Sequence, residues 1–383
     1  MSEQVHTTFR RWAEGRGVRI DGLRVSKLPG KGIGVVASRY LKKEETLISV
    51  PASSLITLDS RLVQVHERKI KDCSVHGSVA AALTLNHGKP ERVYKAWESV
   101  WPTMEDLQPM PFTWSPNQQD HLPPAVQALL KHQRSKFDRD WAALDGEISE
   151  NLKDLYEYYW LIVNTRCFYW TYFKKAKDAA KKGKSLSRDD CMALCPFADY
   201  LNHADEGCTF HYDTKGITVV CNRDYAAGEE VVVSYGAHSN DYLLVEYGFI
   251  LQENKDDSTK VDHIILPMLT KAQATFLEQH DYLGDYTLDS AGVCYRTQVA
   301  LRSTFTSAKR MEQFLAGGWD GEKDDAKVAT IRNNILQEFQ DEIEAKLAEL
   351  VEMEDSAVVS TLVMRWEQIL AMTEAVLEKG EVS

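Results

Sequence analysis

The spacing of apolar positions divides the chain into four stretches that alternate between strand-like and helix-like patterns. Apolar and polar residues alternate from 18 to 50, where a DG turn divides "VRIDGLRV" and "PGK" precedes "GIGVVASR". From about residue 62 to 175, apolar residues recur every three or four positions, as in amphipathic helices. The strand pattern returns between 208 and 233, and the chain after about residue 266 is helical to its end.

This order predicts an α+β fold. The strands come in short, hairpin-spaced clusters, which favours a β-core with an inserted and a C-terminal helical unit over a doubly wound sheet. The first cluster is predicted to form a small antiparallel sheet. Residues 326–353 are predicted to form one long amphipathic helix that needs packing against other helices. The lysine-rich segment 174–190 is predicted to be a solvated loop between the insert and the second β-region.

Length, composition and charge narrow the class of protein. A chain of 383 residues can bury a large core and form two or three structural units. No run of about eighteen apolar residues occurs and the N-terminus has no apolar signal-peptide core, so we expect a soluble protein of the cytoplasm or nucleus, without membrane contact. The net charge of −12 argues against direct nucleic-acid binding and is compatible with a basic protein substrate.

The seven cysteines do not indicate a metal site or a disulfide framework. They are an odd number and contain no CxxC pair. Cys191, Cys195 and Cys208 with His203 have a spacing that matches no common zinc pattern. We therefore predict reduced thiols and no metal.

Three motifs carry candidate chemistry, and each has a structural explanation when taken alone. "KGIGVVA" (31–37) places two glycines at a turn into a strand, where a ligand can approach the backbone, although most such pairs are ordinary hairpins. It also lacks the third glycine of a dinucleotide fingerprint. "ADYLNHA" (198–204) puts an acid, an amide and an imidazole in an apolar stretch, where each needs a partner if buried. "EEVVVSYGAHSNDYLLVEYGF" (229–249) adds aromatic residues after a strand and after a short helix.

Together these motifs resemble the SET-domain methyltransferases, in the subgroup exemplified by rubisco large-subunit methyltransferase and its relatives that act on non-histone proteins. "KGIG", "ADYLNHA", "GEEVVVSYG" and "SNDYLLVEYGF" occur in the family's order, and the specific match lies in residues 17–60 and 160–255. The resemblance implies an α+β fold: a SET-domain β-core of short antiparallel sheets with pseudoknot-like threading, a helical insert and an all-helical C-terminal domain. It divides the chain into two SET segments (1–60 and 189–263), the insert (61–188) and a substrate-binding domain (264–383).

The resemblance also implies an activity. The chain would transfer methyl groups from S-adenosylmethionine to the ε-amine of a lysine in a protein, release S-adenosylhomocysteine and need no metal. Tyr235 would be the catalytic residue, because its hydroxyl can orient the amine and the methyl group. Arg166 would bind the donor's carboxylate, Asn202 and His203 the adenine, and Phe249 would stack on that base. The implied cofactor-binding residues are Lys31, Gly32, Ile33, Gly34, Arg166, Asp199, Asn202, His203, Tyr235, Tyr247 and Phe249.

The lysine channel and the substrate leave alternatives open. The implied channel residues are Phe168, Phe210, Tyr212 and Tyr247, with Phe210 and Tyr212 as rival alignments for one position. A histidine methyltransferase of this subgroup has an Asn near the position of Phe168, so the aromatic residue here favours lysine. A non-catalytic SET-fold binding module is a further alternative. We expect a monomer that acts on a non-histone, ribosomal or translation-associated protein.

Overall fold

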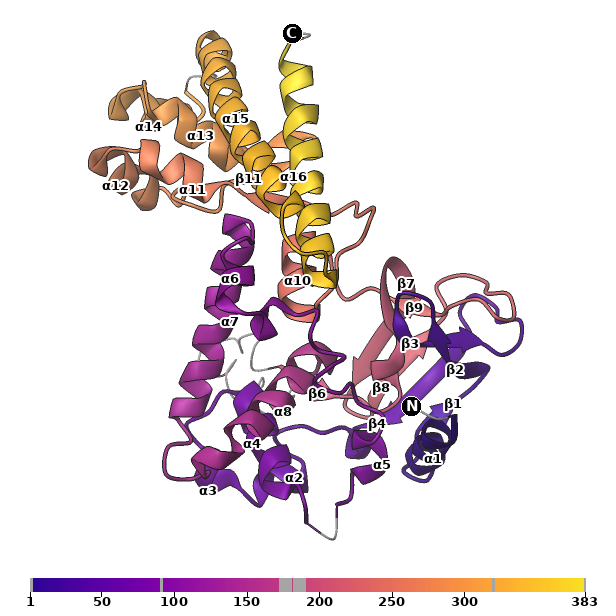
Figure 1. Cartoon of the computed structure of the whole chain (residues 1–383). Coiled ribbons are helices and arrows are strands. Elements are labelled where there is room, and N and C mark those ends of the chain that lie inside the picture. Colours follow the sequence, from indigo (N-terminus) through magenta and orange to yellow (C-terminus); the bar gives the residue numbers. More distant parts are fainter. Residues whose placement is uncertain (1–2, 90–91, 172–180, 182–190, 319–320, 382–383) are drawn as a thin grey trace. The chain divides into compact units, whose positions relative to one another are not determined.

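The computed structural model describes residues 3–89, 92–171, 181, 191–318 and 321–381. The chain separates into a first unit, residues 1–107 and 134–237, and a second unit, residues 108–133 and 238–383. Figure 1 labels their helices and strands along the chain. The predicted loop at 174–190 lies outside the described residues, apart from Lys181. The division into four segments that the family resemblance implies stays a prediction.

The first unit contains the β-core. Its largest sheet has the strand order β1-β4-β8-β7-β9, and within it only the β7–β9 pair is parallel among the described strands. Two smaller antiparallel pairs, β2–β3 and β5–β6, accompany it. The bounds are β1 Arg19–Ile20, β2 Leu23–Leu28, β3 Gly32–Ala37, β4 Thr46–Pro51, β5 Cys167–Tyr169, β6 Met192–Leu194, β7 Asn202–Asp213, β8 Gly216–Val220 and β9 Val232–Val233.

The DG turn of "VRIDGLRV" has a different role from the predicted one. β1 pairs with β4 and β2 pairs with β3, so the strands on either side of the turn enter different sheets, and the prediction of one small sheet was wrong. The amide N–H of Asp21 continues the β1–β4 pairing by donating to the Leu47 carbonyl at 2.9 Å. Gly22 then turns away with φ +65, and a Cβ there would lie 2.4 Å from Leu41 Cδ2. Close packing therefore requires glycine at this turn.

Helices of the first unit confirm the predicted helical insert. The bounds are α1 Glu3–Glu14, α2 Arg61–Gln64, α3 Glu67–Ile70, α4 Val75–Asn86, α5 Lys95–Glu98 and α8 Lys153–Arg166, while α7 Pro124–Ala142 has residues of both units. α4 is buried from Val75 to Thr84 and packs against α8, where the rings of His76 and Trp160 stack at 4.1 Å. The buried carboxylate of Asp140 accepts hydrogen bonds from Ser74 and from Trp160 Nε1.

The second unit is helical with a small sheet. Its helices are α6 Pro116–Gln119, α10 Asn240–Tyr247, α11 Asp262–Ile265, α12 Lys271–Gln279, α13 Tyr295–Ser303, α14 Ala308–Leu315, α15 Glu322–Val351 and α16 Ala357–Glu381. α15 contains nearly all of the predicted long helix and lies beside α16 (Figure 1). The helical C-terminal region is confirmed, but "all-helical" omits the strands β10 Thr259–Lys260, β11 Thr287–Asp289 and β12 Gly292–Val293.

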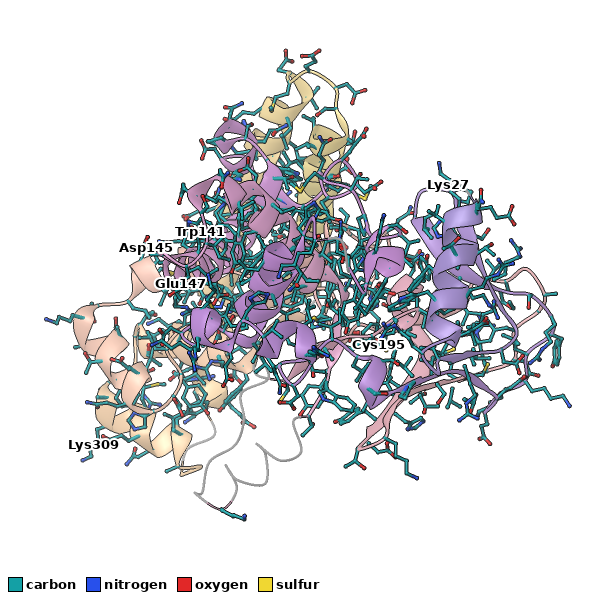
Figure 2. The ribbon with its side chains drawn as sticks, turned by 90° about the horizontal axis from the view of Figure 1, so that it is seen from below. Lys27, Trp141, Asp145, Glu147, Cys195 and Lys309 are labelled. Atoms are coloured by element: carbon teal, nitrogen blue, oxygen red, sulfur yellow. The ribbon has the colours of Figure 1, made fainter. Side chains whose placement is uncertain are left out.

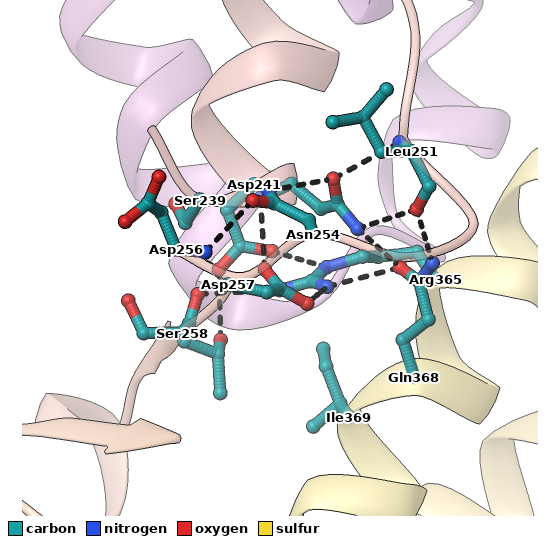
Figure 3. A network of polar contacts seen from close by, with 12 residues as sticks. Ser239, Asp241, Leu251, Asn254, Asp256, Asp257, Ser258, Arg365, Gln368 and Ile369 are labelled. Carbon is teal, nitrogen blue, oxygen red and sulfur yellow. Dashed lines mark hydrogen bonds and ion pairs between the residues drawn. The ribbon is translucent and has the colours of Figure 1, made fainter. Parts of the chain in front are cut away.

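A buried ion network joins α10 and α16 inside the second unit (Figure 3). Arg365 on α16 is 0% exposed, and its guanidinium donates to Asp241 Oδ1 and Asp257 Oδ2, each at 2.6 Å. Asp241 accepts a further hydrogen bond from the Thr259 hydroxyl at 2.8 Å. Two carboxylates and one guanidinium thus satisfy one another away from water, which fixes the start of α10 against α16.

Candidate active site

Asp199 joins three segments of the first unit. The chain passes the fully buried Cys195, labelled in Figure 2, and enters a 3-10 turn at Ala198–Tyr200. The Asp199 side chain is 2% exposed, and its Oδ2 accepts from Trp97 Nε1 at 2.9 Å. Its backbone carbonyl accepts from Arg166 Nη1 at 2.7 Å, and Oδ2 lies 3.4 Å from the same nitrogen. Oδ2 of this buried acid therefore has N–H partners, whereas Oδ1 is buried and has no hydrogen-bond partner among the described residues.

Two opposing effects act on the pKa of the Asp199 carboxyl group. Burial raises the pKa of this carboxyl above its ordinary value, and the charge of Arg166 with hydrogen bonding from Trp97 works in the other direction. Arg166 and Trp97 therefore favour the ionised form of this carboxyl against the effect of its burial.

Arg166 is the last residue of α8, and its side-chain Nε–H is available to a ligand. Its Nη1 serves Asp199, but its Nε is buried and has no hydrogen-bond partner among the described residues. A buried donor without a partner costs about 1–3 kcal/mol, so this position is suited to a ligand that brings an acceptor. A carboxylate fits best, because guanidinium N–H groups bind carboxylates through charge-assisted hydrogen bonds.

Asn202 and Lys31 meet at Glu230, which the sequence reasoning did not single out. Asn202 Nδ2 donates to Glu230 Oε1 at 3.0 Å, and Lys31 Nζ lies 2.7 Å from Glu230 Oε2. A Cβ on Gly34 would lie 2.6 Å from Asn202 Nδ2 and 2.5 Å from Leu28 Cδ1. Gly34 therefore makes room for the amide of Asn202 and for Leu28, and this is the close approach that its missing side chain allows.

The other residues of the glycine motif form the β2–β3 hairpin. Gly32 pairs with Leu28 and Ile33 with Lys27. Gly32 has φ +72, and a Cβ on it would meet nothing within 4 Å, so its backbone conformation, and not crowding, favours glycine there. The hairpin is brought to "ADYLNHA" by the contact of Gly34 with Asn202.

His203 and Tyr235 meet where β7 and β9 run parallel. His203 pairs with Val233 in this register, and the backbone N–H of Tyr235 donates to His203 Nδ1 at 3.0 Å. The two rings lie 5.1 Å apart between centroids. Accepting this bond requires Nδ1 without a proton, which sets the tautomer of a neutral ring.

The Tyr235 hydroxyl is oriented by the same segment. It donates to the Leu201 carbonyl at 2.9 Å, in the residue just before Asn202. Desolvation raises the pKa of Tyr235 to about 12, so this hydroxyl is neutral at physiological pH. With its proton committed to Leu201, it interacts with a further group only as an acceptor.

The channel candidates separate into two aromatic pairs. Phe168 on β5 and Phe210 on β7 have ring centroids 4.8 Å apart, and both are half-buried. Tyr212 instead contacts Tyr169 at 5.2 Å, and each of these two is 45% exposed. The structure therefore brings Phe210, and not Tyr212, to Phe168.

Tyr247 and Phe249 belong to the second unit. They flank Gly248, which ends α10 with φ +79, and their ring centroids are 6.2 Å apart. A Cβ on Gly248 would lie 2.9 Å from Met110 Cγ. Their predicted contacts with the donor and the lysine stay a prediction.

Sequence reasoning missed three groups of this site: the Glu230 carboxylate, the Leu201 carbonyl and the Trp97 indole. Glu230 stands beside the apolar strand of "GEEVVVSYG", so its charge there was the available signal. Trp97 follows ordinary helical spacing in "KAWESVW", which carries no sign of a partner 102 positions away.

The described residues contain neither a cluster of metal-ligating side chains nor a membrane-spanning helix. In that part of the chain, no group of three or more His, Cys, Asp or Glu residues is arranged to hold a metal ion. Nor does any helix there have the length and apolar character to cross a membrane.

Comparison with known proteins agrees with this geometry. The SET domain model matches residues 32–236, and the model of the Ribosomal lysine N-methyltransferase 2 C-terminal domain matches residues 257–379. Ribosomal lysine N-methyltransferase set11 of Schizosaccharomyces pombe is 27% identical over 354 residues, 87% of this chain and 87% of that protein. Ribosomal lysine N-methyltransferase 2 of Saccharomyces cerevisiae is 26% identical, over 68% of this chain and 63% of that protein.

A solved structure of rubisco LSMT bound to AdoMet has the same fold. It matches with a TM-score of 0.65 at 15% identity, over 100% of this chain and 92% of that one. The predicted α+β fold with a SET core is confirmed.

Proposed function

The chain belongs to the SET-domain family, and from this membership and the site geometry we infer that it methylates the ε-amine of a lysine in a protein substrate, with S-adenosylmethionine as donor. S-adenosylhomocysteine is the second product. The observation that carries the proposal is the meeting of Asn202 and His203 on β7 with Tyr235 just after β9, which Asp199 links to the buried Nε donor of Arg166.

The donor side of the site is assigned to this group of residues. When bound, S-adenosylmethionine supplies a methyl group on a sulfonium, which a neutral amine accepts by in-line displacement. Arg166 Nε binds the donor's carboxylate, since it is a buried N–H beside Asp199 that lacks a partner among the described residues. The segment at Asn202 and His203 receives the adenine. Lys31, Ile33 and Gly34 present backbone groups to the methionine end.

On the lysine side, the protein has to supply a neutral amine. Deprotonating a lysine with a pKa of about 10.4 costs roughly 4 kcal/mol near pH 7.4. Apolar walls lower that pKa by desolvation, and Phe168 and Phe210 are the aromatic pair that supplies them in the first unit. Tyr235, whose pKa is about 12, is too weak an acid to be ionised and acts by accepting a hydrogen bond from the amine.

The substrate is proposed to be a ribosomal or other translation-associated protein. Two relatives named above are ribosomal lysine methyltransferases, and the C-terminal domain model named for one of them matches residues 257–379 here. A basic protein also complements a chain with a net charge of −12. We place the enzyme in the cytoplasm or nucleus and expect it to act as a monomer.

Methylation of histidine is the second candidate within the same fold. Phe168 favours lysine, because its ring lies against Phe210 where the amide of an Asn would offer polar groups to an imidazole.

Phe210 also lacks a hydroxyl that would bind the methylated amine, which favours more than one methyl group per lysine.

Labelled donor and a lysate from cells that lack this protein test the proposal. The expected result is label on a ribosomal or translation-associated protein, placed on lysine by mass spectrometry, with Phe210→Tyr shifting the product toward fewer methyl groups. Label on histidine supports the second candidate. Donor binding without transfer to any protein would instead indicate a binding module.

A further inference from the structure

We propose that Trp97, on the short helix α5 of the insert, is a positioning residue that sets the affinity for the methyl donor. It acts by fixing Asp199 and, through Asp199, the guanidinium of Arg166. This role rests on the proposed function, because it assumes that Arg166 receives the donor's carboxylate. Trp97 itself does not contact the reacting atoms.

The contacts form a continuous chain within the first unit. Trp97 is 0% exposed, and its Nε1 donates to Asp199 Oδ2 at 2.9 Å. Arg166 Nη1 lies 2.7 Å from the Asp199 carbonyl but 3.4 Å from Oδ2. The carboxylate oxygen that attracts Arg166 is thus shared with an indole, and the ion pair is longer than an ideal one.

The indole cannot easily turn away from this contact. Its rings stack against Phe9 at 6.1 Å with an interplanar angle of 11°, and they meet Trp101 edge-on at 5.6 Å. Packing on two sides therefore fixes the direction of the Nε1–H bond. This packing joins the insert and α1 to the Asp199 turn.

Because Asp199 Oδ2 accepts a hydrogen bond from Trp97, it pairs less fully with Arg166. Without the indole N–H, the only side-chain charge close to Oδ2 among the contacts above is the guanidinium, which would then close the 3.4 Å gap and pair with the carboxylate more fully. That movement withdraws Nε from the place where it meets a ligand. Trp97 thereby keeps Arg166 from being neutralised inside the protein.

Donor binding by Trp97→Phe measures this effect, because Phe keeps an aromatic ring and removes the N–H. Calorimetry is done with S-adenosylmethionine and with its decarboxylated analogue, which lacks the group that Arg166 binds. We expect the Kd for S-adenosylmethionine to rise about tenfold, the size of one hydrogen bond to a charged group. The Kd for the decarboxylated analogue should change less than about twofold, and kcat at saturating donor should stay near the wild-type value.

Trp160→Phe is the matched control. Trp160 is also fully buried, and its Nε1 donates to a buried carboxylate, that of Asp140, at 3.3 Å. The substitution removes the same kind of hydrogen bond elsewhere in the first unit. Stability should fall in both variants, whereas donor selectivity should change only in Trp97→Phe. If Trp97→Phe does not fold, Asp199→Asn is the second variant: it removes the charge that would neutralise Arg166 and keeps the backbone carbonyl that holds Nη1. The Kd for S-adenosylmethionine should then not rise, and a tenfold rise would overturn the role.

The outcomes separate the two proposals. An unchanged Kd for S-adenosylmethionine in Trp97→Phe, or an equal loss for both donors, overturns the positioning role. In an Arg166→Ala background Trp97→Phe should have no further effect on affinity, and an additive loss would also overturn it. A wild-type protein that binds neither donor overturns the proposed function itself.

Discussion

Two buried arginine–aspartate pairs, one in each unit, differ in how completely the arginine is used. Arg365 in the second unit is 0% exposed and donates from Nε, Nη1 and Nη2 to Asp241, Asp257 and the Ser258 carbonyl. Arg166 in the first unit is 18% exposed, its contact to Asp199 goes through Nη1, and its Nε has no partner among the described residues.

The difference indicates what each pair is for. A guanidinium whose nitrogens are all engaged holds segments together, as Arg365 holds α10 to α16 (Figure 3). A guanidinium that keeps a buried donor unpaired carries a cost of about 1–3 kcal/mol, which a bound acceptor removes. Incomplete pairing therefore distinguishes Arg166 from Arg365.

The largest effect is expected from Arg365→Ala. Removing this cation leaves the buried Asp241 and the partly buried Asp257 without their counter-charge, and breaking a buried pair costs about 3–5 kcal/mol. Denaturant unfolding should show this loss in the second unit. Lys309→Ala, an exposed change on α14, should stay within about 0.5 kcal/mol of wild type. A stable Arg365→Ala protein that has lost donor affinity would contradict the structural role of Arg365 and assign it to donor binding instead.

Arg166→Ala should act mainly on the donor. Loss of a charged hydrogen bond of about 1.5–3 kcal/mol predicts a Kd for S-adenosylmethionine roughly ten- to a hundredfold higher. The loss of stability should be smaller than for Arg365→Ala, because one carboxylate is left instead of two and Trp97 still donates to it. Calorimetry and unfolding on the same preparation give both numbers. Equal donor affinity in variant and wild type would remove Arg166 from the site.

Tyr235→Phe should separate methyl transfer from donor binding. If the hydroxyl orients the amine during transfer, kcat should fall at least about tenfold, or roughly 1.4 kcal/mol, with the Kd for the donor nearly unchanged. Phe keeps the ring beside His203, so stability should change little. Steady-state kinetics with saturating donor measure the effect. A wild-type kcat would make Tyr235 a packing residue that ends a strand.

The smallest effect concerns the pH dependence of stability. The pKa of Asp199 is raised on folding by burial, so the folded protein binds this proton more readily than the unfolded chain does. Its contribution to the free energy of unfolding should therefore fall as pH rises from the ordinary value near 3.8 through the folded pKa. Unfolding of wild type and Asp199→Asn across acidic pH isolates this contribution. A wild-type advantage that grows with pH in that interval would mean that Arg166 outweighs burial.

The sequence alone determined the order of the strand and helix regions and the motifs that make up the site. Periodic apolar positions show which side of a segment is buried, so the local pattern predicted the helical insert and α15. The candidate roles of Tyr235, Asn202 and His203 followed from their motifs and from family resemblance. The "ADYLNHA" segment was correctly expected to need partners, since burying an acid and an amide without them is costly.

Only the tertiary structure decided which partners those are. Asp199 meets Trp97 across 102 positions, Lys31 meets Glu230 across 199, and the two strands beside the DG turn enter different sheets. The choice between Phe210 and Tyr212 also depended on β5, which brings Phe168 to one ring and Tyr169 to the other. Local pattern specifies that a side chain is buried, whereas the packing of distant segments specifies what it is buried against.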